Sequence, residues 1–237
     1  MRVLDIDLDF FLADCCPLAP LGERPALLGH EPWSAEAVID FLERQCGLSP
    51  ARPLPGAIFP THDGALRFWA ERIRDGALVA PFHVTHIDAH SDLGIGKPGP
   101  GFVLNTVLCQ SPERRADLMR WYDMKQLDEA NYLLFALAFR WVSALDNVRN
   151  PKSRPDIPRD ILLPGRTDAI RLSSFASRLM EGRNGLEPVV PFAVYDDYTT
   201  FEADTPFDFV TVAVSPRYAP KEADALLPVF ERYIAAR

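Results

Sequence analysis

The segment with the clearest capacity for chemistry is Asp88-Ala89-His90-Ser91-Asp92. Its three alternating metal-competent side chains, Asp88, His90 and Asp92, follow an apolar run at 79–84 that we expect to be a buried strand. Unpaired charge at the exit of such a strand would cost several kcal/mol. A divalent cation is the commonest partner of carboxylate and imidazole together. The pattern therefore indicates a metal site, with an exposed turn capped by Asp or Ser as the alternative.

A second acidic segment lies at the start of the chain, where residues 1–11 predict a strand carrying Asp5, Asp7 and Asp9. Because side chains alternate along a strand, these carboxylates would share one face opposite an apolar face. They repel one another unless positive charge lies among them. Asp5 and Asp9 would be about 13 Å apart, so a small two-metal centre can use only one adjacent pair. Ligands gather at the carboxyl ends of parallel strands, which favours Asp7 and Asp9, with Asp5 as a hydrogen-bonded group behind them.

Together the two segments resemble the arginase and agmatinase (ureohydrolase) superfamily. Residues 88–92 match its D-A-H-x-D signature, and residues 5–11 are similar to its S-x-D-x-D-x-F segment, with Asp5 where the family has Ser. The two motifs occur here in reversed order, which looks like a circular permutation. The short chain, its first segment and Asn131-Tyr132-Leu133 look most like the peptide arginases of ribosomal-peptide (RiPP) maturation. The resemblance implies one arginase- and deacetylase-like domain over residues 1–237.

The resemblance also implies a reaction: Mn²⁺-dependent hydrolysis of arginine side chains in a precursor peptide to ornithine and urea, by a hydroxide that bridges two Mn²⁺ ions. Asp92 would pass the proton to the departing amine, and Asp88 would bridge both ions together with Asp7. The implied ligands are His62, Asp88, Asp92 and Asp7 for one ion and His90, Asp88, Asp7 and Asp9 for the other. The family's proton-shuttling histidine has no counterpart downstream of residue 92, where Asn105 lies nearest.

Three further sets of residues are candidates for the site, although their sequence patterns are less specific than the two motifs. His62 follows a short strand at 56–59, where the family has a G-G-D-H turn but this chain reads Pro60-Thr61-His62-Asp63. The alternative is an ordinary loop histidine before a helix capped by Asp63. His86 shares a strand face with Asp88 and could orient a ligand. The acidic residues after the strand at 189–195 could grip a guanidinium or form a solvated turn: Asp196, Asp197 and Glu202.

Composition limits the functional classes. The chain has 237 residues, is 48% hydrophobic and carries a formal net charge of −8. It is thus long enough for a substantial core, and its acidic balance argues against a nucleic-acid partner. No apolar run approaches the length of a membrane span, and no signal peptide is evident. The four cysteines lack zinc spacing, so we expect a cytoplasmic protein with reduced thiols.

The elements that must position these residues alternate along the chain. We expect loops at 12–32, 93–101 and 150–166, the second of them lining a cleft, and a mostly helical stretch at 112–145. Helices are expected at 35–46, before Gly76, after residue 172 and from residue 221. Strands are expected at 56–59, 79–88, 169–172, 189–195 and 209–214, the first two as a parallel β-α-β pair. This alternation predicts a three-layer α/β/α domain with a mainly parallel sheet.

Two other functions remain open at this point. A small-molecule amidinohydrolase or deacetylase would keep the fold and the metal chemistry. A non-catalytic metal-binding interaction protein would keep only the ligands, since fold alone does not establish activity.

Overall fold

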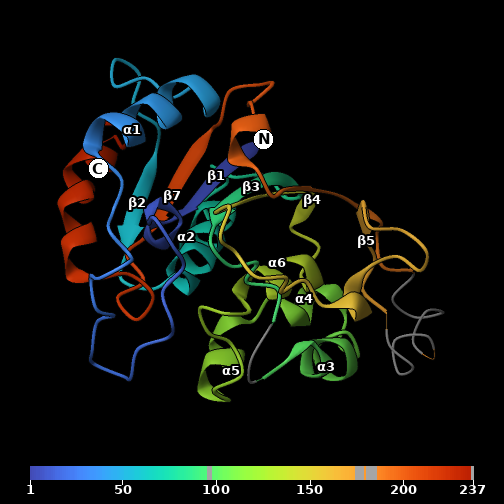
Figure 1. The fold of residues 1–237 in the computed structure, drawn as a ribbon. Helices are drawn as coiled ribbons and strands as arrows, with labels where there is room; N and C mark the ends of the chain where they lie inside the picture. The colour runs from blue at the N-terminus through green and yellow to red at the C-terminus, as the bar shows by residue number, and fades with distance from the viewer. Residues whose placement is uncertain (95–97, 174–178, 180–185, 236–237) are drawn as a thin grey trace.

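Seven strands form one sheet in the computed structural model, which describes residues 1–94, 98–173, 179 and 186–235 (Figure 1). Their order across the sheet is β2-β7-β1-β3-β4-β6-β5. All neighbouring pairs are parallel except β5 and β6, which are antiparallel. The predicted α/β class with a mainly parallel sheet is confirmed. The strands are β1 (Arg2–Asp7), β2 (Gly56–Phe59), β3 (Phe82–Asp88), β4 (Val142–Arg149), β5 (Ala169–Ile170), β6 (Val190–Tyr195) and β7 (Phe209–Ala213).

Short helices connect the strands. Ser34 caps the first of them by accepting a hydrogen bond from the Ala37 amide, as the sequence predicts. The α-helices are α1 (Ala35–Asp40), α2 (Asp63–Arg74), α3 (Pro100–Phe102), α4 (Pro112–Arg115), α5 (Leu118–Asp123), α6 (Tyr132–Ala138) and α8 (Leu227–Glu231). The tighter or wider helical turns are η1 (Leu8–Phe11), η2 (Phe41–Gln45), η3 (Val103–Val107), η4 (Arg159–Ile161), η5 (Tyr198–Thr200) and η6 (Lys221–Leu226). None of the helices within the described part of the chain is long and apolar enough to cross a membrane.

The first strand is shorter than the sequence predicts. It ends at Asp7, whose carboxylate accepts a 3.0 Å hydrogen bond from the Asp9 amide and caps the 3₁₀ turn η1. Placing Asp9 on the strand was therefore wrong. The period-two pattern continues past the strand end because the side chains of η1 are all buried, which hides the change of backbone. The turn redirects Asp9 toward the strand-exit edge of β3, where its Oδ1 accepts a hydrogen bond from the Ala89 amide.

Other boundaries also differ from expectation. The predicted helical stretch at 112–145 ends at Ala138, and β4 follows from Val142. The strand expected from residue 79 begins at Phe82. The two strands expected as a β-α-β pair, β2 and β3, run parallel but are separated by β7 and β1. The helix expected after residue 172 lies largely outside the described residues. The loop expected at 12–32 is present, closed at its ends by a bridge between Leu12 and Pro32.

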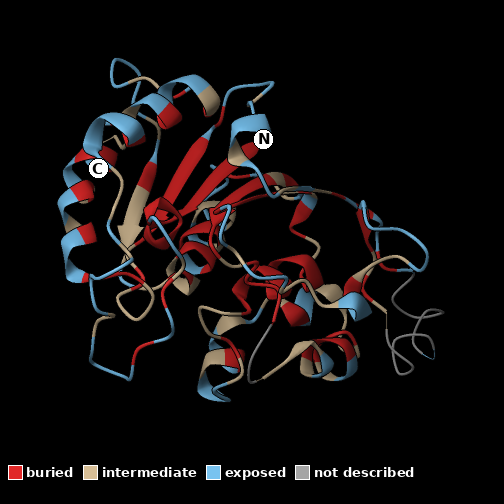
Figure 2. Cartoon of the chain, in the orientation of Figure 1, coloured by how far each residue is buried: buried red, intermediate tan, exposed pale blue. Residues whose placement is uncertain are grey.

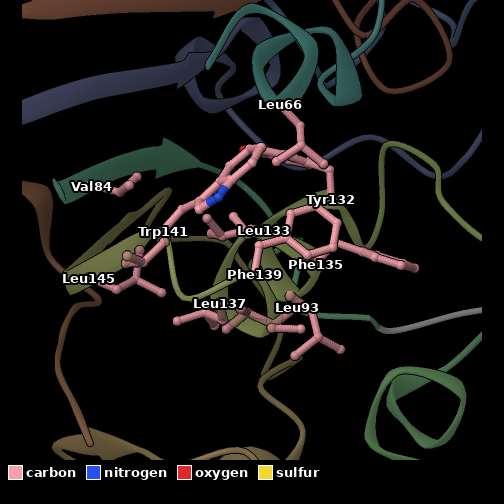
Figure 3. Close-up of a cluster of buried hydrophobic side chains, with 14 of the residues drawn as sticks. Leu66, Val84, Leu93, Tyr132, Leu133, Phe135, Leu137, Phe139, Trp141 and Leu145 are labelled. Atoms are coloured by element: carbon pink, nitrogen blue, oxygen red, sulfur yellow. The ribbon is translucent and has the colours of Figure 1, made fainter. Parts of the chain in front are cut away.

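Apolar side chains are buried on both faces of the sheet, and its central strands are covered (Figure 2). One cluster packs α2 and α6 against the sheet through residues such as Trp69, Leu133 and Phe135 (Figure 3). The other packs α1 and α8 against the opposite face through Val38 and Phe230. Two cores on the two faces fit the expected three-layer arrangement.

The acidic residues of β1 face the first of these cores. Val3 belongs to the α2–α6 cluster and Leu4 to the opposite one, so Asp5 and Asp7 lie on the side of Val3 by alternation. The predicted shared face is thus confirmed for Asp5 and Asp7. Parallel pairing of β1 with β3 then sets Asp5 opposite His86. Carboxylates and imidazoles of neighbouring strands therefore meet at the carboxyl edge of the sheet.

Candidate metal centre

Two groups of metal-competent side chains lie at the carboxyl edge of β1 and β3. The first comprises His62, His86, Asp88 and Asp92, and the second Asp9, Asp88 and His90. Within each group the ligand atoms lie within 4.8 Å of one another. The sequence predicted five of these six residues as ligands. Segments separated by up to about 80 residues of chain are thus brought together as expected.

Asp88 belongs to both groups, and its two carboxylate oxygens face different ones. Oδ2 lies 3.0 Å from Nδ1 of His62 and 3.3 Å from Nε2 of His86. Oδ1 lies 3.6 Å from Nδ1 of His90 and accepts a 2.7 Å hydrogen bond from the His90 amide. Hydrogen bonds from these three histidines outweigh burial and hold the pKa of Asp88 well below its usual range. A carboxylate in this position can bridge two cations.

His62 follows β2 and is buried at the start of α2. Its Nδ1 lies 3.0 to 3.2 Å from one carboxylate oxygen each of Asp7, Asp88 and Asp92. A single N–H can donate to only one of these oxygens well; Oδ2 of Asp7 also accepts a hydrogen bond from Ser215, and Oδ2 of Asp88 also lies 3.3 Å from Nε2 of His86. The interpretation of His62 as an ordinary loop histidine does not fit this burial. Asp63 does not cap α2 either: its side chain accepts hydrogen bonds from Thr61 and Tyr122.

His86 is the member of the first group that we expected only behind the ligands. Its Nδ1 lies 3.2 Å from Oδ2 of Asp5, which leaves Nε2 directed toward Asp88. This Nε2 atom is buried and makes no hydrogen bond of acceptable geometry. Burial lowers the pKa of His86, but its contacts with Asp5 and Asp88 outweigh burial and raise the pKa to about 10. The position of Nε2 makes His86 a candidate ligand in its own right.

The second group lies nearer to solvent. Oδ2 of Asp9 is 2.9 Å from Nδ1 of His90, whose side chain is 35% exposed. Burial and the neighbouring carboxylates of Asp7 and Asp88 raise the pKa of Asp9 well above its usual range. The ring of Tyr218 contacts His90 edge-on, with ring centroids 4.9 Å apart. An incoming molecule would therefore meet His90 before the deeper histidines.

Asp92 is set into the first group by an unusual backbone conformation. Its φ of 50° lies in the left-handed region, which costs energy for a residue other than glycine. The conformation brings Oδ2 to 3.0 Å from Nδ1 of His62. Burial, followed by repulsion from Asp88, raises the pKa of Asp92 to about 7. Asp92 can therefore hold or release a proton near neutral pH, as expected for a proton carrier.

Residues behind the ligands were only partly foreseen. Asp5 was expected there, and its Oδ1 accepts a 2.6 Å hydrogen bond from Thr211 while Oδ2 accepts one from the hydroxyl of Tyr132. Asp7 was expected as a ligand of both ions but belongs to neither group; it contacts His62 and accepts a hydrogen bond from Ser215. The roles of Tyr132, Thr211 and Ser215 were missed. Ser215 could have been found from the sequence, because it directly follows a predicted strand, as several of the ligands do.

The three acidic residues proposed to grip a guanidinium do not join either group of the described structure. Asp197 instead caps η5 by accepting from the Thr199 amide. Asp196 is exposed and lies 3.6 Å from Nε of Arg149. Glu202 is exposed beyond η5. A role in substrate binding stays a prediction for all three.

The residues present fit a divalent cation. The first group offers two imidazole nitrogens and two carboxylates, and the second offers one imidazole and two carboxylates. Such mixed nitrogen and oxygen sets suit divalent transition metals. The buried Nε2 of His86 would gain a partner, and the converging oxygens around His62 would gain a positive charge. These residues could thus hold a metal ion.

Comparison with known proteins adds no relative: no family model matches the chain, and no curated protein or solved structure matches it either. The likeness to ureohydrolases therefore depends on the two sequence motifs alone.

Proposed function

We propose that this chain is a dinuclear metallohydrolase that converts arginine side chains of a peptide into ornithine, with release of urea. The observation that carries the proposal is the position of Asp88, whose two oxygens face two adjacent groups of candidate ligands. Two cations about 3.5 to 4 Å apart, sharing a carboxylate, are typical of hydrolytic two-metal sites. The motifs that resemble ureohydrolases supply the choice of a guanidinium as substrate.

The proposed ligands differ in two respects from those implied by the family: His86 is added, and Asp7 is assigned to one ion instead of bridging both. His62, His86, Asp88 and Asp92 would hold one ion, and Asp9, Asp88 and His90 the other. Asp7, which contacts His62, would complete the first set as the resemblance implies. The chemistry that such ions supply is the acidification of water, whose pKa falls from 15.7 to about 7 on binding. Manganese is the proposed metal because carboxylates predominate among the ligands.

Among the chain's own groups, Asp92 would then move the proton. The carboxyl group of Asp92, which lies 3.0 Å from Nδ1 of His62 within the first group, would take a proton from the attacking water. It would return this proton to the nitrogen that leaves with the ornithine side chain. Attack at the guanidinium carbon and cleavage of its bond to that nitrogen give urea and the free amine.

The experiment that tests the proposal is incubation of the protein and Mn²⁺ with arginine-containing peptides. We expect urea and a loss of about 42 Da per converted arginine, the mass of CH₂N₂ removed in guanidine hydrolysis. Asp88→Asn should abolish both signals. The matched control is Asp168→Asn, because Asp168 is exposed and pairs only with Arg166 among the described contacts.

The remaining outcomes separate the alternatives. Turnover of agmatine or an acetylated amine, without turnover of any peptide, would assign the site to a small-molecule hydrolase. Binding of Mn²⁺ without turnover of any of these substrates would leave a metal-binding interaction protein.

A further inference from the structure

A cavity of about 440 Å³ opens beside the second ligand group. Ala89 and His90 line it, so it adjoins the candidate metal centre at His90. Residues 14–17 and His30 of the loop at 12–32 line one wall, and residues of the loop at 150–166 line the other. The volume lies within the range of about 300 to 1,000 Å³ that is usual for ligand sites. The cavity is therefore large enough to receive backbone as well as a side chain.

The two walls are fastened to each other and to the ligand segment. The buried side-chain amide of Asn150 donates to the backbone carbonyls of Phe10 and Leu12, at 2.9 and 2.8 Å. Asp156 accepts a 2.7 Å hydrogen bond from the amide of Ser91, between two candidate ligands, and a 2.6 Å one from Arg149. Both loops are thus held by buried polar contacts at their base. This is the construction expected of a preformed binding cleft.

The charge on one wall opposes the charge of the site. Lys152 and Arg154 line the cavity and are exposed, and neither forms an ion pair with any described residue. A guanidinium alone would gain nothing from two cations at the entrance, because like charges repel. Two acidic residues line the cavity: Asp156 is engaged by Arg149, and Asp14, on the facing loop, forms no ion pair with either cation in the described structure. Lys152 and Arg154 are therefore available to bind a negative group from outside the chain.

We propose that this cleft binds a peptide in which the target arginine is flanked by acidic residues, and that Lys152 and Arg154 bind the flanking carboxylates. The inference rests on the proposed function only for the identity of the central arginine. The proposed reaction places the arginine at the metal centre, while the two cations recognise the neighbouring side chains and exclude basic neighbours. The cleft thus selects by the charge pattern of the peptide, positive at the centre and negative beside it.

The test measures binding and hydrolysis separately on three fluorescein-labelled peptides of equal length. Each has one central arginine, flanked on both sides by glutamate, glutamine or lysine. Fluorescence anisotropy with the Mn²⁺-loaded protein gives the dissociation constants, and urea release gives the turnover. We expect the glutamate peptide to bind about 10-fold more tightly than the lysine peptide, as two exposed ion pairs gained and two repulsions avoided would give. Lys152→Glu combined with Arg154→Glu should reverse this order.

Arg159→Glu is the matched control, because Arg159 lies on the same loop, is exposed and does not line the cavity. This variant should keep the order of the three dissociation constants. It changes the net charge by the same amount as Lys152→Glu or Arg154→Glu alone. Equal binding of the peptides, or the same loss of preference in the control, overturns the proposal. Urea release without any preference would overturn the cleft assignment and leave the proposed function intact. Preference without urea would support the cleft and reject the hydrolase.

Discussion

The carboxylates of Asp88 and Asp92 should respond in opposite ways when each is replaced by asparagine in the metal-free protein. Asp88 contacts His62 and His86 at 3.0 and 3.3 Å, and together with Asp5 it raises the pKa of His86 to about 10. Near neutral pH it therefore neutralises buried positive charge. Removing one partner of a buried pair costs about 3 to 5 kcal/mol, because the remaining charge has no partner. Asp88→Asn should lower the free energy of unfolding by about this amount.

The ionised carboxylate of Asp92, by contrast, destabilises the folded protein. Its pKa of about 7 means that burial and Asp88 disfavour its ionised form. A carboxyl whose pKa is raised on folding weakens the folded state as pH rises from its ordinary value, near 3.9, through about 7. At slightly alkaline pH, Asp92→Asn removes this penalty. The free energy of unfolding of the metal-free variant should therefore stay unchanged or increase.

Urea denaturation in the presence of a chelator, followed by circular dichroism, compares the two variants directly. Calorimetric titration with Mn²⁺ then supplies a second comparison. Asp88→Asn should weaken binding in both groups, because the carboxylate is shared, whereas His90→Ala should remove only one of two binding events. Equal destabilisation by Asp88→Asn and Asp92→Asn would refute the charge assignment, and retention of two tight sites in Asp88→Asn would refute the bridging position.

Two further changes test the surroundings of the centre. Because the pKa of His86 is raised from an ordinary 6.5 to about 10, its contribution is complete below about pH 6.5 and is lost as pH rises toward 10; urea denaturation of the chelated protein should show this decline, and Mn²⁺ should suppress it by replacing the proton. A flat or rising profile without metal would contradict the expectation. Tyr132→Phe removes the hydroxyl that donates to buried Asp5. It should cost about 1 to 3 kcal/mol of stability and about 10- to 100-fold in Mn²⁺ affinity, measured by denaturation and calorimetry, whereas Tyr122→Phe, outside the centre, should leave the Mn²⁺ affinity unchanged.

Much of the candidate site could be predicted because its residues follow a simple rule of position. Asp88, His90 and His62 follow or end strands that can be recognised from short apolar runs, and parallel strands place such residues at one edge. Residues behind the ligands depend on contacts that no local pattern records. Tyr132 reaches Asp5 across 127 positions of sequence, and Thr211 reaches it across 206.

The errors in the fold have a similar cause. In the stretch at 112–145, α6 and β4 are both apolar and only three residues separate Ala138 from Val142. Periodicity cannot distinguish short buried helices from short buried strands. The end of β1 was missed for the same reason, since η1 is as buried as the strand before it. β2 and β3 are separated by β1 and β7, the first and last strands of the described residues, which no pattern local to residues 56–88 reveals.

The central place of β1 between β3 and β7 has a consequence for how the molecule folds. β1 can be paired on both sides only after β7, about 200 residues later, has docked beside it. Most of the conformational entropy is therefore lost before the β1–β7 hydrogen bonds stabilise the fold. A chain of this kind is expected to collapse early and to complete its acidic edge late. Metal binding would then be among the last events of refolding, and its rate would report when refolding is complete.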